Sequence, residues 1–99
     1  MKMYTNSEQT AKLIELGFEK PKTPNFYSVG ATWVQCEGNY SIGELLSFLP
    51  TRTYSGSIYI DYNGLWRVGY ENTVRHQSEF ELIDALYFMC VRLKEEGMV

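Results

Sequence analysis

Residues 57–71 contain the feature that most constrains the fold, because two β-rich runs are separated there by the sequence Asp-Tyr-Asn-Gly. The flanking runs are rich in β-branched and aromatic residues, and Asn-Gly is a strong turn signal. The sequence therefore predicts a β-hairpin. The remaining elements must supply the layer that covers its apolar face.

Two registers of this hairpin are compatible with the turn sequence, and they group the side chains differently. In a two-residue turn, the isoleucines share a face with Arg67. If residues 62–64 form a three-residue loop with Gly64 left-handed, Ile60 opposes Trp66 and the two faces separate. We therefore predict the three-residue loop. Its apolar face would hold Ile58, Ile60, Trp66, Val68 and Tyr70, and its outer face Tyr59, Asp61, Leu65, Arg67 and Gly69.

Two short helices are predicted before the hairpin. Residues 6–17 follow a capping box at residues 5–8, and Gly17 is a natural end. Residues 41–44 form a second capping box, and the apolar residues that follow it at helical spacing stop at Pro50.

A longer helix is predicted near the carboxyl end, from a third capping box at residues 78–81 to about Glu96, with Gly97 after its last turn. We expect its apolar face to pack on the Trp66 side of the hairpin. That face comprises Leu82, Ile83, Leu86, Met89, Cys90 and Leu93.

One further strand is predicted at residues 29–36, after a polar loop at residues 19–28. Residues 51–56 and 72–77 are predicted to be polar connectors. The predicted fold is therefore α+β in the order α-β-α-β-β-α, with a three-stranded, mainly antiparallel sheet. If the first strand joins a hairpin strand in parallel, the crossover between them should be right-handed.

The composition indicates a single domain at residues 1–99. Apolar residues make up 44% of the chain and aromatic residues 15%, and 99 residues are too few for two independent cores. The net charge of −3 is spread over both halves without a basic stripe, which argues against a nucleic-acid partner. No run approaches the roughly 20 apolar residues of a membrane span, and no secretory signal is recognisable. We expect a cytoplasmic protein.

The sequence contains no constellation that predicts an enzyme, a cofactor or a metal site. His76 is the only histidine, and only Cys36 and Cys90 could form a dyad with it. We expect a solvent-exposed loop histidine and two free, buried thiols. The helix macrodipole explains the acidic residues at the start of the last helix without catalysis. These are Glu79, Glu81 and Asp84.

Apolar residues interrupt the polar face of the last helix, and they are the candidate partner-binding residues. Phe80, Phe88 and Val91 fall on the side that should be charged. Either the first helix covers them as a second layer, or they bind a second copy of the chain or another protein.

A second hypothesis concerns the outer face of the hairpin. Tyrosines cluster there near two arginines, and such a platform could bind single-stranded nucleic acid weakly through Tyr59, Leu65 and Arg67. The alternative is that aromatic residues simply favour strands. The residues grouped in the platform are Tyr54, Tyr59, Tyr62, Tyr70, Arg52 and Arg67.

Several short motifs together resemble a group of short uncharacterised proteins encoded by gut bacteria and their phages or mobile elements. The resemblance implies only an intracellular accessory role, and it implies no activity. The partner we expect is a second copy of the chain or an unknown host or phage protein. The motifs are Leu16-Gly17-Phe18, Tyr40-Ser41-Ile42-Gly43-Glu44-Leu45-Leu46 with Leu49-Pro50, Trp66-Arg67-Val68, and Ile83-Asp84-Ala85-Leu86 followed by Leu93-Lys94-Glu95.

Overall fold

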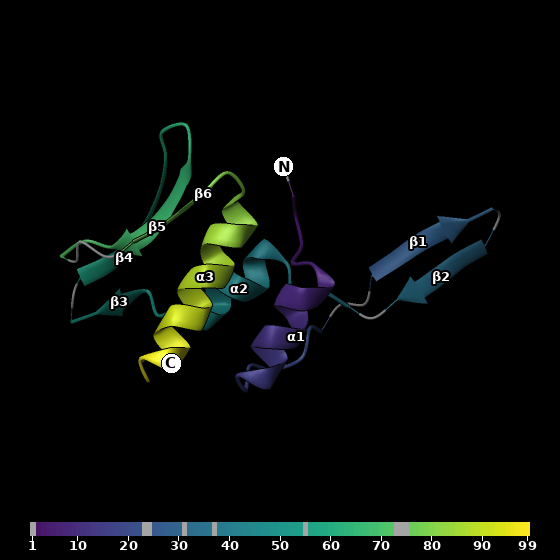
Figure 1. Cartoon of the computed structure of the whole chain (residues 1–99), viewed down its shortest axis with the longest axis horizontal. Coiled ribbons are helices and arrows are strands. Elements are labelled where there is room, and N and C mark those ends of the chain that lie inside the picture. Colours follow the sequence, from purple (N-terminus) through teal and green to yellow (C-terminus); the bar gives the residue numbers. More distant parts are fainter. Residues whose placement is uncertain (1, 23–24, 31, 37, 55, 73–75) are drawn as a thin grey trace.

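The computed structural model describes residues 2–22, 25–30, 32–36, 38–54, 56–72 and 76–99, and it confirms a small α+β domain (Figure 1). The elements in chain order are α1 (Ser7–Glu15), β1 (Asn25–Val29), β2 (Thr32–Cys36), α2 (Ile42–Phe48), β3 (Arg52–Thr53), β4 (Gly56–Tyr62), β5 (Trp66–Tyr70), β6 (His76–Glu79) and α3 (Leu82–Glu95).

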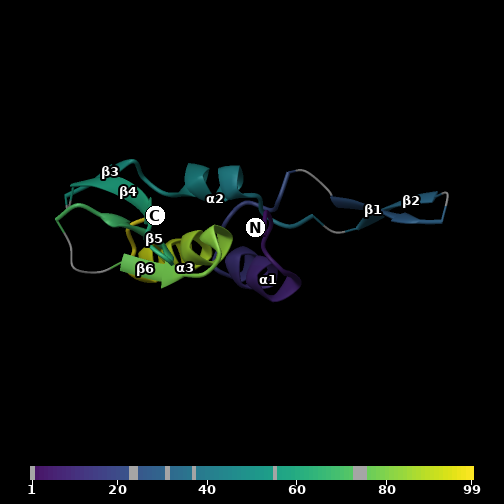
Figure 2. The ribbon, with the colours of Figure 1, turned by 90° about the horizontal axis from the view of Figure 1, so that it is seen from above.

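The main sheet is antiparallel and has four described strands, in the order β3-β4-β5-β6, instead of the three that were predicted. Helix α3 packs on one face of this sheet, and α1 and α2 lie beside α3 (Figures 1 and 2). The buried core lies between these layers. Helix α3 supplies half of its residues, five from the expected apolar face together with Ala85. The members of the core are Leu13, Tyr40, Leu45, Leu49, Val68, Tyr70, Ile83, Ala85, Leu86, Met89, Cys90 and Leu93.

The loop predicted at residues 19–28 is wrong in its second half, because Asn25–Val29 form β1. Among the described strands it pairs only with β2, and the two form a separate sheet that projects away from the helices (Figures 1 and 2). Val29 pairs with Thr32 across a two-residue loop that begins at Gly30, whose φ is +62°. The predicted strand at residues 29–36 thus starts later and finds a neighbour next to it in the sequence. Since closing a two-residue loop loses less chain entropy than a crossover, it does not join the main sheet.

The central hairpin has the predicted three-residue loop, but the loop comprises residues 63–65 instead of 62–64. Ile60 therefore pairs with Val68, and Tyr62 pairs with Trp66. The predicted register was wrong by two residues. Because side chains alternate with a period of two, this even shift leaves the apolar face as predicted.

Contacts near the tip account for the observed register. The rings of Tyr62 and Trp66 lie 5.0 Å apart between centroids. On the outer face Asp61 stands directly opposite Arg67, and both Arg67 Nε and Nη2 donate to its carboxylate. Aromatic pairs and opposite charges across neighbouring strands stabilise a register, and the predicted loop would have separated both pairs.

Both predicted connectors contain short strands. Arg52–Thr53 form β3 and His76–Glu79 form β6. The capping box predicted at residues 78–81 is also wrong, because Ser78 and Glu79 belong to β6. Helix α3 begins at Leu82, and its N-cap residue Glu81 makes no side-chain capping hydrogen bond. A cap contributes only about 1 kcal/mol, so pairing four residues with the open side of β5 outweighs it.

The other helix ends follow the sequence more closely. Helix α2 has the predicted capping box, with Ser41 as N-cap. The box of α1 lies one residue later than predicted, because Asn6 and not Thr5 caps the helix. The hydroxyl of Thr5 instead accepts from the Tyr40 N–H and bonds to the Thr10 hydroxyl. Gly97 follows α3 in the left-handed conformation, as expected.

Candidate partner-binding surface

The structure places the three candidate partner residues in three different environments. Phe80 precedes α3 in the bend after β6 and is 82% exposed. Phe88 lies on the second turn of α3 and is 41% exposed. Val91 is partly buried and packs against the core. The two phenylalanines are thus the accessible members of the set.

Helix α1 covers one side of α3, which agrees in part with the second-layer interpretation. Near its start, the Gln9 amide donates to Asp84 Oδ1 at 2.8 Å. Just after its end, the Phe18 ring lies 5.4 Å from Lys94 Nζ. The two helices therefore run side by side in the same direction. On a helix of 3.6 residues per turn, Val91 projects between the two contact points and Phe88 projects outside them.

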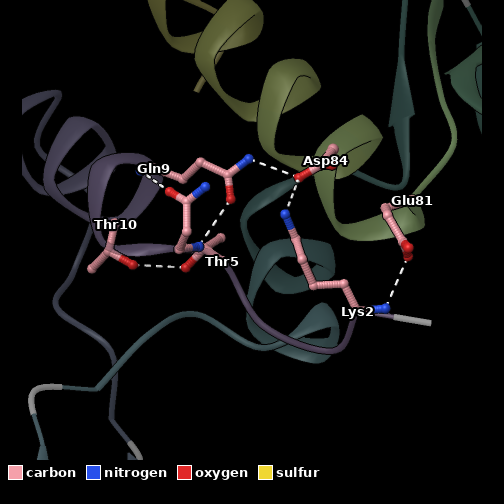
Figure 3. Close-up of polar contacts among 7 residues, drawn as sticks. Lys2, Thr5, Gln9, Thr10, Glu81 and Asp84 are labelled. Atoms are coloured by element: carbon pink, nitrogen blue, oxygen red, sulfur yellow. Dashed lines mark hydrogen bonds and ion pairs between the residues drawn. The ribbon is translucent and has the colours of Figure 1, made fainter.

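The segment before α1 holds the amino end of α3 through a polar clamp (Figure 3). The Lys2 backbone N–H donates to Glu81 Oε2 at 2.8 Å, and Lys2 Nζ lies 2.8 Å from Asp84 Oδ1. Sequence reasoning attributed both acids to the helix macrodipole. Asp84 does lie in the first turn of α3, and both carboxylates also bind Lys2 across α3, a long-range role that no local pattern could indicate.

Exposed apolar side chains flank this clamp. Phe80 directly precedes Glu81, and Phe88 follows Asp84 by one helical turn. Met3 follows Lys2 and is 53% exposed. We call Met3, Phe80 and Phe88 the α3 amino-end surface. Large exposed apolar residues around a neutralised ion pair are typical of protein-binding surfaces.

The polar groups beneath this region satisfy one another. The Tyr40 N–H donates to Thr5 Oγ1, which lies 2.7 Å from Thr10 Oγ1, and Thr10 Oγ1 donates to Asn39 Oδ1. Because the amide oxygen can only accept, the Thr5 hydroxyl must donate to Thr10. These linked hydrogen bonds, which we call the relay, lie beside a hollow of about 350 Å³. That hollow is lined by Ser7, Thr10, Ala11, Ile14, Glu15 and Asn39.

The hollow offers little chemistry. Glu15 is its only ionisable side chain, and it contains neither a cysteine nor a histidine. Among the residues described, no three or more histidine, cysteine or acidic side chains are grouped so that they could hold a metal ion. The relay therefore explains how α1 is tied to the chain before α2, and it suggests no reaction.

The residues considered for a catalytic dyad lie in unsuitable environments. His76 is exposed, as expected, although it belongs to a strand and not to a loop. Cys90 is fully buried, its Sγ lies 3.7 Å from the Leu45 carbonyl oxygen, and burial raises the pKa of its thiol to about 12. A substrate could not reach this protonated thiol. The side chain of Cys36 lies outside the described residues.

The aromatic platform is only partly assembled. Tyr54 and Tyr62 are exposed, but Tyr70 is buried and its hydroxyl donates to the Pro50 carbonyl, so grouping Tyr70 with them was wrong. The hydrogen bond from Arg67 lowers the pKa of Asp61. A phosphate would compete with this carboxylate for the guanidinium, and nucleic-acid binding stays a prediction.

Comparisons with protein-family models, with curated proteins and with solved structures find no match to this chain. None of the helices in the described part of the chain is long and apolar enough to cross a membrane. Support for the candidate surface therefore comes from the geometry of this chain alone.

Proposed function

We propose that this chain is a non-enzymatic protein-interaction module that binds another protein, either a second copy or a different chain, through the α3 amino-end surface. The observation that carries the proposal is the 82% exposure of Phe80, together with the 41% exposure of Phe88. Burying a phenylalanine stabilises an interface by roughly 1.5–3 kcal/mol. Two such residues can therefore anchor a partner.

The clamp makes this surface suitable for binding. Lys2 ties the chain start to Glu81 and Asp84, so the backbone that carries the exposed side chains is held before a partner arrives. Preorganisation of this kind lowers the entropy lost on association. Because Lys2 already neutralises Asp84, a partner need not supply a buried countercharge there. Where the partner is not a second copy, we expect a host or phage protein.

The test compares the double variant Phe80→Ser/Phe88→Ser with Tyr54→Ser. Tyr54 is 91% exposed and follows β3, the edge strand at the opposite end of the sheet from β6, so it controls for the loss of an exposed aromatic residue. Self-association is measured by sedimentation velocity over a wide concentration range. Binding to other proteins is measured by quantitative pull-down from the native host.

We expect the double variant to weaken the interaction by roughly 100-fold or more and Tyr54→Ser to leave it unchanged. A wild-type chain that stays monomeric at high concentration removes the self-association form and leaves the binding of a different protein. If the double variant self-associates and captures the same proteins as the wild type, the α3 amino-end surface is not the binding site.

A further inference from the structure

The main sheet has an open edge on β4, two strands away from β6, which leads into Phe80. Strand β4 extends to Tyr62, whereas its neighbour β3 pairs with only the first two residues of β4, Gly56 and Ser57. One more bond, from the Ile58 N–H to the Thr51 carbonyl, prolongs this pairing. Beyond it the described strands offer β4 no partner on that side.

The hydrogen bonds of β4 show which backbone groups point to the open edge. The Ser57 carbonyl accepts from Glu71, and the Asn63 N–H donates to Leu65. Odd-numbered residues of β4 thus bond to β5 and its flanking residues, and even-numbered residues point the other way. The N–H and C=O groups of Ile60 and Tyr62 therefore face outward, past the end of β3.

The side chains along this edge are apolar, although the edge strands of proteins usually carry residues that prevent pairing with another strand. Native sheets commonly blunt an edge strand with lysine, proline or a bulge. Here Ile60 is 38% exposed and Tyr62 is 61% exposed, and Trp66 lies beside Tyr62 on the same face. In Figure 1 the turn between β4 and β5 reaches beyond the amino end of α3, so the helix does not cover this part of the sheet.

We propose that the Ile60–Tyr62 edge binds an extended segment of a different protein by strand addition, and that this segment has an apolar–basic–apolar pattern. The two outward-facing residues supply two N–H donors and two C=O acceptors in the spacing of a strand. Residues that pair with Ile60 and Tyr62 share their face and contact apolar side chains. The residue between them stands opposite Asp61, whose carboxylate binds Arg67 on the β5 side and has lone pairs left to accept from a lysine or arginine on the open side.

The same geometry disfavours a second copy of the chain at this edge. A symmetric β4–β4 pair that used all the outward-facing groups would have its twofold axis at Asp61. The two Asp61 carboxylates would then stand directly opposite each other, each already bound to Arg67 of its own chain, so neither would supply the other with a hydrogen-bond donor. A partner with a basic residue at this position gains the interaction that a second copy loses. The site lies two strands from Phe80, which follows the Trp66 partner Glu79, and it differs from the α3 amino-end surface in binding through backbone groups.

The first measurement is amide hydrogen exchange of the full chain by NMR. The amides of Ile60 and Tyr62 should exchange rapidly, whereas those of Tyr59 and Asp61, which face β5, should be protected. Adding the capped peptide Thr-Thr-Val-Lys-Val-Thr-Thr should slow exchange at Ile60 and Tyr62 and shift their resonances. Protected Ile60 and Tyr62 amides in the free chain, or peptide shifts elsewhere only, would overturn the proposal.

Two altered peptides and one variant test the assigned contacts. N-methylation of both valines removes the donors that face β4 and should abolish binding. Replacing the lysine of the peptide with glutamate should weaken binding by about fivefold, as expected for a cross-strand charge pair. The variant Asp61→Lys should reverse that preference. Equal binding of the methylated peptide, or an Asp61→Lys chain that still prefers lysine, would contradict strand addition in this register.

Discussion

The buried thiol of Cys90 should make the stability of this protein fall above about pH 9, and Cys90→Ser should remove much of that dependence. Burial raises the pKa of this thiol from an ordinary 9.0 to about 12. Between these values the unfolded chain releases the proton and the native chain keeps it. The native state then binds more protons than the unfolded state, so the free energy of unfolding decreases as pH rises.

The size of the effect follows from this difference. Between about pH 8 and about pH 10, the thiol alone should lower the free energy of unfolding by about 1 kcal/mol, since each pKa unit corresponds to about 1.4 kcal/mol. Burial also raises the pKa of Tyr40 and Tyr70 to about 12. These two hydroxyls act in the same direction above their ordinary pKa of 10.0, and they act equally in the wild type and the variant.

The assay is urea unfolding under reducing conditions, followed by tryptophan fluorescence at both pH values. Cys90→Ser has no titrating group at this site, so its stability should fall less than that of the wild type by about 1 kcal/mol. Cys90→Ala serves as a second variant if the buried hydroxyl prevents folding. An equal loss in the wild type and in both variants would show that the thiol does not resist ionisation in the native state.

Four further substitutions test local features of the fold by the same unfolding assay. Asn6→Ala removes the α1 cap and should destabilise the chain by about 1 kcal/mol. Asp84→Asn weakens the clamp to Lys2 and should cost about 0.5 kcal/mol at low salt, a difference that should shrink at high salt. Gly97→Ala, at φ +74°, should cost about 1 kcal/mol, whereas Gly43→Ala in α2 should be neutral or stabilising.

The helices could be predicted because their signals are local. A capping box and an apolar stripe lie within a few residues of each other, and these placed α2 correctly and gave the buried face of α3. The first box was displaced by one residue because Thr5 bonds to Tyr40, which is 35 residues away. Such a contact depends on how the elements pack, and the sequence around Thr5 carries no sign of it.

The short strands could not be predicted, because their partners define them. Strand β3 has two residues and β6 has the sequence His-Gln-Ser-Glu, so neither is long or apolar enough to show a period of two. The neighbours β4 and β5 supply the backbone groups that hold them. Strand β1 was missed for a different reason, because the prolines before it suggested that the polar loop continued through Asn25–Val29.

The candidate partner residues were found from helical periodicity, but periodicity does not determine exposure. Phe88 and Val91 lie on neighbouring positions of the same helix, and the direction of α1 determines which of them it covers. That direction depends on Gln9 bonding to Asp84 and on Phe18 lying beside Lys94. Phe80 was assigned to the helix only because the capping box was placed too early, yet it is the most exposed of the three.

The observed hairpin register is also what creates the strand-addition site. In the predicted register Tyr62 belongs to the loop, so only Ile60 would present strand-like groups at the open edge. The observed pairing of Tyr62 with Trp66 extends β4 and adds a second outward-facing donor and acceptor. A peptide can then form one pair of hydrogen bonds with Ile60 and a second pair with Tyr62, on the two sides of Asp61. Nuclear Overhauser contacts between the backbones of Tyr62 and Trp66 would confirm this register, whereas contacts between Ile60 and Trp66 as direct partners would remove the site.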